Sequence, residues 1–243
     1  MTPAASELIS EQFFRRATEE HLAVADPARA LKMQAYLKSE IPHFGVPRAQ
    51  SRKINVTLAA EILNADNRSE DAATRLETSR YAWDHFTHRD HRYAAQDILD
   101  VRSIRGNIDV LPLLTHMVDT GQWWDLIDGI QRQYAALLVN HRQEIAELLL
   151  TWATHENKWR RRTAIIAQLN LKAETDTTLL TTVIERNASH PDFFVRKAIG
   201  WALREYAKTD EQWVRDFLGT HSGDLSSLSI REASKHLLNS KHE

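Results

Sequence analysis

The sequence has no cysteine among its 243 residues. This absence excludes disulfide bonds, zinc sites built on thiolates and a thiol nucleophile. No apolar run approaches the ~20 residues that a bilayer-spanning helix needs. The first residues, MTPAASELIS, also lack the basic segment followed by an apolar one that marks a secretory signal. We therefore expect a cytoplasmic protein that contacts no membrane.

Glycine and proline are scarce, with 7 and 6 residues, so the chain has little material for the tight turns of a β-rich fold. Apolar residues recur at spacings of three to four, and no convincing alternating strand is present. Helices are predicted at 6–23, 27–40, 48–64, 69–86, 91–102, 107–119, 123–139, 142–155, 158–171, 176–188, 192–208, 210–219 and 225–239. Asp26-Pro27, Asn157 and the HPD sequence at 190–192 are typical helix starts.

The helix rhythm favours a stack of antiparallel pairs, because one compact bundle cannot easily give so many short helices a shared core. Residues 141–171 and 176–208 each predict one such pair, with a period near the ~40 residues of HEAT-type repeats. We therefore predict an all-α, HEAT-like helical-repeat solenoid, an α-α superhelix that forms a single domain over residues 1–243. Its concave face would hold an extended ligand.

The net charge of −2 conceals an uneven distribution. Residues 157–208 hold ten Lys and Arg against five Asp and Glu, a local balance of +5, whereas the rest of the chain is acidic. A basic segment in an otherwise acidic protein indicates a surface that meets an anionic partner. Chance unevenness is the alternative.

The stretch GQWWDLIDGI, residues 121–130, sets two tryptophans and two aspartates within six positions. On the predicted helix 123–139, Trp123 falls on the apolar stripe and is expected in the core. Trp124 and Asp128 share a face beside that stripe. Trp124 is either a rim residue that covers a helix junction or part of a site with Asp128.

The segment NKWRRRTAIIAQLNLK, residues 157–172, contains an arginine on its apolar side. Arg162 projects from the same side as Trp159 and Ile166, whereas Arg160 and Arg161 point elsewhere. A guanidinium on an apolar face is costly unless it is paired or reaches an anion. Two interpretations stay open: an internal salt bridge or snorkelling side chain, and an arginine directed into a groove, where it binds a phosphate with two nitrogens.

The segment PDFFVRKAIGWALREYAKTD, residues 191–210, predicts a helix with a second distinct face. Its members are Lys197, Gly200, Trp201, Arg204 and Lys208. Glycine costs a helix about 1 kcal/mol relative to alanine, but lets a backbone or ligand approach closely. Basic side chains around an aromatic suit a nucleic-acid backbone. The alternative is a second packing face against the next repeat.

Three stretches, WWDLIDGI, NKWRRRTAIIAQL and FFVRKAIGWALREYAK, occur in this order and with separations that resemble the AlkD-like DNA glycosylases. These are the HEAT-like repeat enzymes of bacterial DNA alkylation repair. The segment MQAYLKSEIPHFGVPRAQSR, residues 33–52, is similar to the family's N-terminal signature. The resemblance thus extends over nearly the whole chain, and the last of the three stretches is its most specific part.

The resemblance implies an active site made of four residues. The family's active-site tryptophans map onto Trp124 and Trp201, its essential aspartate onto Asp128 and its active-site arginine onto Arg162. It also implies that Tyr36 and Arg52 face DNA and that Arg204 contacts the backbone. With neighbouring basic residues included, the predicted DNA-binding residues are Tyr36, Arg48, Arg52, Arg161, Lys197, Arg204 and Lys208.

The implied activity is the excision of cationic N3- and N7-alkylated purines from duplex DNA, by hydrolysis of the N-glycosidic bond in base excision repair. Asp128 would stabilise the cationic sugar and orient water, the two tryptophans would flank the sugar, and Arg162 would hold a phosphate. The lesion need not be flipped into a pocket. No cofactor, metal or obligate protein partner is implied, and such an enzyme would act at the bacterial nucleoid.

Two other interpretations stay open. A non-catalytic HEAT-like scaffold that holds DNA or a protein would keep the basic face and have no need of Asp128. A metal hydrolase is suggested by HFTHRDH at 85–91, where His85, His88 and Asp90 or His91 would supply ligands. The sequence has neither a Ser-His-Asp hydrolase motif nor a glycine-rich phosphate loop.

Overall fold

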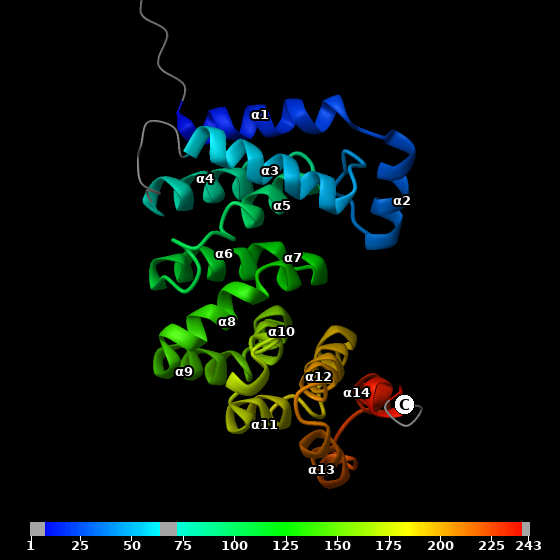
Figure 1. Ribbon diagram of the computed structural model, residues 1–243. Coiled ribbons are helices and arrows are strands. Elements are labelled where there is room, and N and C mark those ends of the chain that lie inside the picture. Colours follow the sequence, from blue (N-terminus) through cyan, green and yellow to red (C-terminus); the bar gives the residue numbers. More distant parts are fainter. Residues whose placement is uncertain (1–7, 64–71, 240–243) are drawn as a thin grey trace, which may run out of the picture. The chain divides into compact units, whose positions relative to one another are not determined.

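The computed structural model describes residues 8–63 and 72–239, and every regular element in these residues is a helix (Figure 1). The prediction of an all-α fold is therefore confirmed. Small parts of the predicted helices, residues 6–7, 64 and 69–71, lie outside the described residues. Among the described helices, none is long and apolar enough to span a bilayer.

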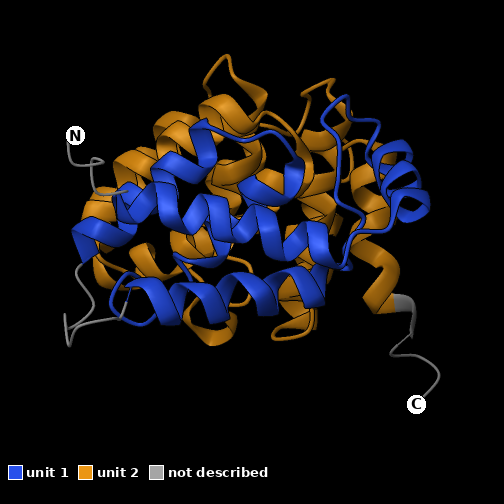
Figure 2. Cartoon of the chain, turned by 90° about the horizontal axis from the view of Figure 1, so that it is seen from above, with its two compact units in different colours: residues 1–105 blue, residues 106–243 orange. Residues whose placement is uncertain are grey.

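The described chain divides into two compact units, which Figure 2 colours separately, and residues 1–105 make up the first. Its helices are α1 (Ile9–Ala23), α2 (Pro27–Leu37), α3 (Arg48–Leu63), α4 (Ala72–Asp84) and α5 (Arg89–Asp97). α1 packs on α3, α4 and α5, and α5 also packs on α3 and α4. The side chains of Phe13, Leu58 and Trp83 are buried in this core. α2 is less enclosed, since Leu37 is its one buried residue.

The second unit, residues 106–243, carries the three stretches on which the resemblance depends. Its helices are η2 (Ile108–Val110), α6 (Leu111–Gly121), α7 (Trp124–Gly129), α8 (Gln131–Asn140), α9 (Arg142–Trp152), α10 (Lys158–Ile166), η3 (Lys172–Glu174), α11 (Thr177–Glu185), α12 (Phe193–Tyr206), α13 (Glu211–His221) and α14 (Ser227–Asn239). α10 packs on α12, and α12 packs on α14, so these three helices form a consecutive row (Figure 1). α9 packs on α8, α10 and α11.

This packing agrees with the predicted repeats, each of which is a pair of helices. The predicted pair at 141–171 corresponds to α9 and α10, which pack together, and the pair at 176–208 corresponds to α11 and α12. α11 packs on α9 and α10, while α12 continues the row from α10. The helices of successive pairs therefore stack on their counterparts, as they do in helical repeats.

The predicted helix starts are confirmed at atomic detail. Asp26, Asn157 and Asp192 each accept a hydrogen bond from a backbone N–H of the following first turn, at 2.9, 2.9 and 2.8 Å. Such caps satisfy donors that have no partner inside the helix. Two of the three open α10 and α12, so the helices that carry Arg162 and Trp201 begin at positions fixed by capping side chains.

The prediction of one helix over 123–139 is wrong. The chain forms the short helix α7 and then α8, with Ile130 between them at φ −102° and ψ 1°. Gly129, a poor helix former, precedes the break. Trp123 lies before α7 in an extended conformation, at φ −148° and ψ 144°, and it is half-buried rather than fully enclosed.

Candidate active site

A largely buried ion pair joins α7 to α10 in the second unit. Arg162 donates from Nε to one carboxylate oxygen of Asp128 and from Nη2 to the other, both at 2.8 Å. Its Nη1 donates to the backbone carbonyl of Phe194, at the start of α12, at 2.7 Å. The side chain of Arg162 is 6% exposed and that of Asp128 is 17% exposed. One guanidinium therefore ties together three helices that are distant in the sequence.

This pairing is the first of the two interpretations of Arg162. The structure contains the internal salt bridge, with both Nε and Nη2 directed at Asp128. A phosphate could bind the same two nitrogens only after Asp128 had left them. Contact between Arg162 and a DNA phosphate therefore stays a prediction.

Tryptophan side chains adjoin the ion pair from two helices. Trp201 on α12 lies with the centre of its ring 5.9 Å from Cζ of Arg162, within reach of a cation–π contact. Trp124 lies on α7 one turn before Asp128, so the two share a face of that helix. Both tryptophans are half-buried. The structure brings Asp128, Arg162 and Trp201 together, and it places Trp124 on the adjoining turn.

The ionisation of Asp128 reflects two opposing effects. Burial raises the pKa of its carboxyl group above the usual value, while the hydrogen bonds and charge of Arg162 hold the rise back. Both oxygens accept from one guanidinium, which is the geometry of an ionised carboxylate. A carboxylate offers about four lone-pair positions, and Arg162 occupies two of them. Two positions are therefore left for further hydrogen bonds, on a side chain that is 17% exposed.

An aromatic cluster fixes the junction at which these groups meet. The ring centres of Trp159 and Phe194 are 5.1 Å apart, and Trp123 lies 6.2 Å from the first and 5.5 Å from the second. Phe194 thus contributes a ring to the cluster and a carbonyl to Arg162. This role of Phe194 was not predicted from the sequence, in which the FF pair directly after the cap of α12 is the one local signal.

The distinct face of α12 is largely a packing face against α14. A Cβ atom at Gly200 would lie 2.4 Å from Cβ of Glu232 and 2.8 Å from the backbone oxygen of Ser229. The close approach that this glycine permits is therefore to another helix of the protein. Of the two interpretations of this face, the second packing face is the one observed around Gly200.

Basic residues on the same face converge on one carboxylate. Nζ of Lys197 lies 3.0 Å and Nη1 of Arg204 2.9 Å from the oxygens of Glu232, whose side chain is buried. Lys235, one turn further along α14, donates to both oxygens. Hydrogen bonds from Lys235 and Lys197 lower the pKa of Glu232 to about 2, against the effect of burial. Glu232 and Lys235 were not predicted, because they lie 24 and 27 positions beyond the end of the motif at Lys208.

Arg161 and Lys208 have contacts of their own. Arg161 donates to the backbone carbonyls of residues 153–155, where α9 ends, and desolvation lowers its pKa. Lys208 follows the end of α12 and pairs with Glu205 at 2.6 Å. The first of these arrangements closes a helix end, as basic side chains commonly do. For both residues, contact with DNA stays a prediction.

The remaining predicted DNA-binding residues belong to the first unit. Tyr36 lies on α2 and is 75% exposed. Arg48 donates to both carboxylate oxygens of Asp97, at 2.9 and 2.6 Å, and Arg52 donates to Asp97 and Asp100. Both arginines keep part of their surface exposed. Their contact with DNA also stays a prediction.

The histidines of HFTHRDH have separate partners. The ring of His85 stacks on Tyr81 at 3.9 Å, and that of His88 stacks on Phe44 at 3.8 Å. His91 hydrogen-bonds a threonine hydroxyl of α1. Within the described part of the chain, no group of three or more His, Asp or Glu side chains is arranged to hold a metal ion. The metal-hydrolase interpretation therefore has no site among these residues.

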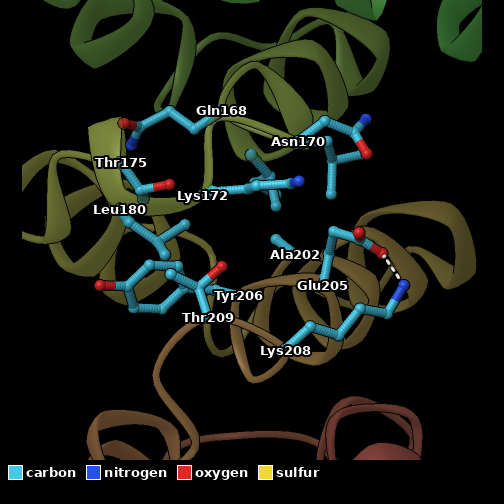
Figure 3. Close-up of a pocket in the computed structure, with 12 residues that line it drawn as sticks. Gln168, Asn170, Lys172, Thr175, Leu180, Ala202, Glu205, Tyr206, Lys208 and Thr209 are labelled. Carbon is cyan, nitrogen blue, oxygen red and sulfur yellow. Dashed lines mark hydrogen bonds and ion pairs between the residues drawn. The ribbon is translucent and has the colours of Figure 1, made fainter.

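A pocket of about 340 Å³ lies in the second unit, near the C-terminal ends of α10 and α12. Ile165, Leu180 and Ala202 give it apolar walls. Figure 3 shows the ion pair between Glu205 and Lys208 along one side of it. None of its lining residues belongs to the predicted catalytic set, so the pocket is separate from the ion pair of Asp128.

Comparison with known proteins places the chain in a family. The model of the family described as DNA alkylation repair enzyme matches residues 18–237. The chain belongs to this family. A solved structure described as a predicted DNA alkylation repair enzyme from Enterococcus faecalis is similar to it, with a TM-score of 0.75 and 30% sequence identity over 88% of this chain and 96% of that one. A comparison with curated proteins gave no match.

Membership of the DNA alkylation repair family confirms the resemblance drawn from the three motifs. It also agrees with the helical-repeat fold, since the similar structure covers most of both chains. The matched range includes all four predicted catalytic residues and every predicted DNA-binding residue. A role in the repair of alkylated DNA is what the family supports.

Proposed function

We propose that this member of the family is a DNA glycosylase that releases cationic N3- and N7-alkylated purines from duplex DNA. The proposal treats residues 1–243 as one functional domain, because the family match runs across both compact units. The observation that carries it is the Asp128–Arg162 pair beside Trp201, in which the aspartate side chain stays 17% exposed.

The chemistry requires a negative charge near the sugar. Alkylation at N3 or N7 makes the base a cationic leaving group and weakens its glycosidic bond. As that bond breaks, positive charge develops on the deoxyribose, and a fixed carboxylate stabilises it. Water then attacks the sugar carbon, and the proton that water loses passes to Asp128. The lone pairs not used by Arg162 are available for both tasks.

Arg162 has a positioning role in this proposal. Its two hydrogen bonds hold the carboxylate in one orientation, and its third anchors the guanidinium to the start of α12. A group that is fixed before the reaction needs no reorganisation as charge develops. Contact with DNA phosphates is left to other basic residues of the chain.

The tryptophans favour the charged transition state. An indole face attracts a cation by roughly 0.5–2 kcal/mol, depending on desolvation. Trp124 and Trp201 would therefore gain more from the cationic sugar than from its neutral ground state, which is the condition for accelerating a reaction. Selectivity would come from the charge and weak bond of the lesion, so neutral lesions should be poor substrates and base flipping into a pocket is not required.

The test measures bases freed from methylated duplex DNA by chromatography. The wild type should release 3-methyladenine or 7-methylguanine. Asp128→Asn should slow release by on the order of 10²-fold or more, as expected for loss of a positioned acid–base group, while binding of lesion-free duplex should persist. Equal rates in mutant and wild type would remove Asp128 from its role, and binding without any release would favour the non-catalytic scaffold.

A matched control is present on the same helix. Arg160 donates from Nε and Nη2 to the two oxygens of Asp119, at 2.7 and 2.6 Å. This pair repeats the geometry of Asp128 and Arg162 between α6 and α10, and neither of its residues belongs to the predicted catalytic set. Asp119 and Arg160 are 35% and 23% exposed, so Asp119→Asn should destabilise the protein less than Asp128→Asn. It should leave the rate of base release close to that of the wild type.

A further inference from the structure

α14 adds a group of charges to the side of α12 that carries Trp201. Lys197, Trp201 and Arg204 are four and three positions apart on α12, so they share one face. Nζ of Lys197 and Nη1 of Arg204 lie 3.0 and 2.9 Å from Glu232, and Nζ of Lys235 donates to both of its oxygens at 2.8 and 2.9 Å. We call Lys197, Arg204, Glu232 and Lys235 the Glu232 cluster.

The Glu232 cluster keeps a net positive charge, because three cations surround one carboxylate. The negative charge is on the inner side: the Glu232 side chain is 8% exposed, while that of Lys235 is 51% exposed. An ammonium group carries three N–H donors and a guanidinium five, and the contacts with Glu232 use only part of them. The solvent-facing side therefore offers N–H donors to an anion.

Glu232 also restricts the motion of the three cations. Long basic side chains lose conformational entropy when a ligand fixes them, but here each already has a shared anchor. Hydrogen bonds from Lys235 and Lys197 keep the pKa of the anchor at about 2, so it is ionised near neutral pH. Gly200 lets α14 approach closely enough for this arrangement. Such pre-organisation favours the binding of an anion that fits between the donors.

We propose that Lys197, Arg204 and Lys235 bind one phosphate of the DNA backbone beside Trp201, with Glu232 as their positioning residue. The inference rests on the proposed function in taking DNA as the ligand, and it adds α14 to the elements that bind substrate. Trp201 lies between Lys197 and Arg204 on the same face, so a phosphate here would place its sugar next to the indole.

The main experiment measures the affinity of a labelled, lesion-free duplex between 50 and 200 mM salt by fluorescence anisotropy. Removal of one lysine that contacts a phosphate lowers the slope of the logarithm of the association constant against the logarithm of the salt concentration by about 0.9–1. The affinity advantage of the wild type over Lys235→Ala should therefore shrink roughly threefold across this range. Lys172→Ala, at another exposed lysine of the second unit, should keep the wild-type slope. An unchanged slope in Lys235→Ala, or an equal change in Lys172→Ala, would overturn the site.

A second pair of variants tests the positioning role. Charge counting alone predicts tighter DNA binding whenever a carboxylate is neutralised. We expect Glu232→Gln to bind the duplex about threefold more weakly, because its cations lose their anchor. Glu211→Gln, which neutralises a carboxylate paired with Arg215 on α13, should bind as tightly as the wild type or more so. Tighter binding by Glu232→Gln would refute the positioning role, and thermal unfolding checks that each variant is folded.

The inference and the proposed function can fail separately. Base release from methylated DNA together with an unaffected salt slope in Lys235→Ala would refute the phosphate site and leave the glycosylase proposal intact. A reduced slope in a protein that frees no base would support the phosphate site and refute the glycosylase.

Discussion

Substituting Gly200 by alanine should destabilise the protein, although the same change stabilises most helices. Alanine improves helix propensity by about 1 kcal/mol. At this position, however, the new methyl group would lie 2.4 Å from Cβ of Glu232 and 2.8 Å from the backbone oxygen of Ser229. Carbon atoms pack at about 3.5 Å or more, so α14 would have to move by roughly 1 Å.

The clash should outweigh the gain in propensity. Overpacking costs about 1–3 kcal/mol, and the upper end applies because a backbone atom cannot rotate away. The expected net loss is about 2 kcal/mol, which corresponds to a fall in Tm of roughly 4–8 °C for a chain of this length. Calorimetry and urea denaturation of Gly200→Ala measure both quantities. A variant as stable as the wild type would refute the close packing of α12 on α14.

Gly219 provides the matched control for this prediction. It lies within α13, and no atom is found within 4 Å of a Cβ built there. Gly219→Ala should therefore show the propensity effect alone and raise stability by up to about 1 kcal/mol. A loss of stability in Gly200→Ala together with a gain in Gly219→Ala would separate the steric cost from the effect of helix propensity. Changes of stability in the same direction would contradict the close packing at Gly200.

Three further predictions follow from the buried charges and the indole. Arg162→Ala should lower the free energy of unfolding by about 3–5 kcal/mol, because Asp128 would be left without a countercharge. Arg162→Lys should restore part of this stability in thermal unfolding. Equal losses of stability in the two variants would contradict the prediction. Trp201→Ala should slow base release about 2- to 30-fold, the rate equivalent of roughly 0.5–2 kcal/mol; an unchanged rate would remove the indole from the mechanism. The pKa of Glu232 falls from 4.5 to about 2 on folding, so its stabilisation, up to about 3 kcal/mol, is complete above pH 5 and is lost towards pH 2. The difference in unfolding free energy between the wild type and Glu232→Gln should therefore shrink as pH falls, and a constant difference would contradict the prediction.

The starts of helices could be predicted from sequence where a side chain determines them. Asn157 and Asp192 cap α10 and α12 through contacts with residues two or three positions away, so the signal is local. The ends of helices were harder to predict from the sequence. The helix predicted over 158–171 ends at Ile166, and Asn170 then adopts φ +69°. The break at Ile130 was also missed, because apolar spacing continues from α7 into α8.

The partners of charged residues could not be derived from the sequence. Periodicity places Arg162 on an apolar side, but it does not identify what lies opposite, and Asp128 is 34 positions away. Glu232 lies 28 positions beyond Arg204 and on a different helix. The grouping of Asp128, Arg162 and Trp201 was predicted from the family resemblance, and the structure adds the salt bridge between Asp128 and Arg162.

The salt bridge between α7 and α10 has a consequence for how related sequences can diverge. Both side chains are largely buried, so replacing one of them would leave the other as an unpaired buried charge. Single substitutions at Asp128 or Arg162 should therefore rarely be tolerated. A lineage in which Asp128 is replaced should soon replace Arg162 as well. Among homologues, the two positions are thus expected to persist as a couple or to disappear as one.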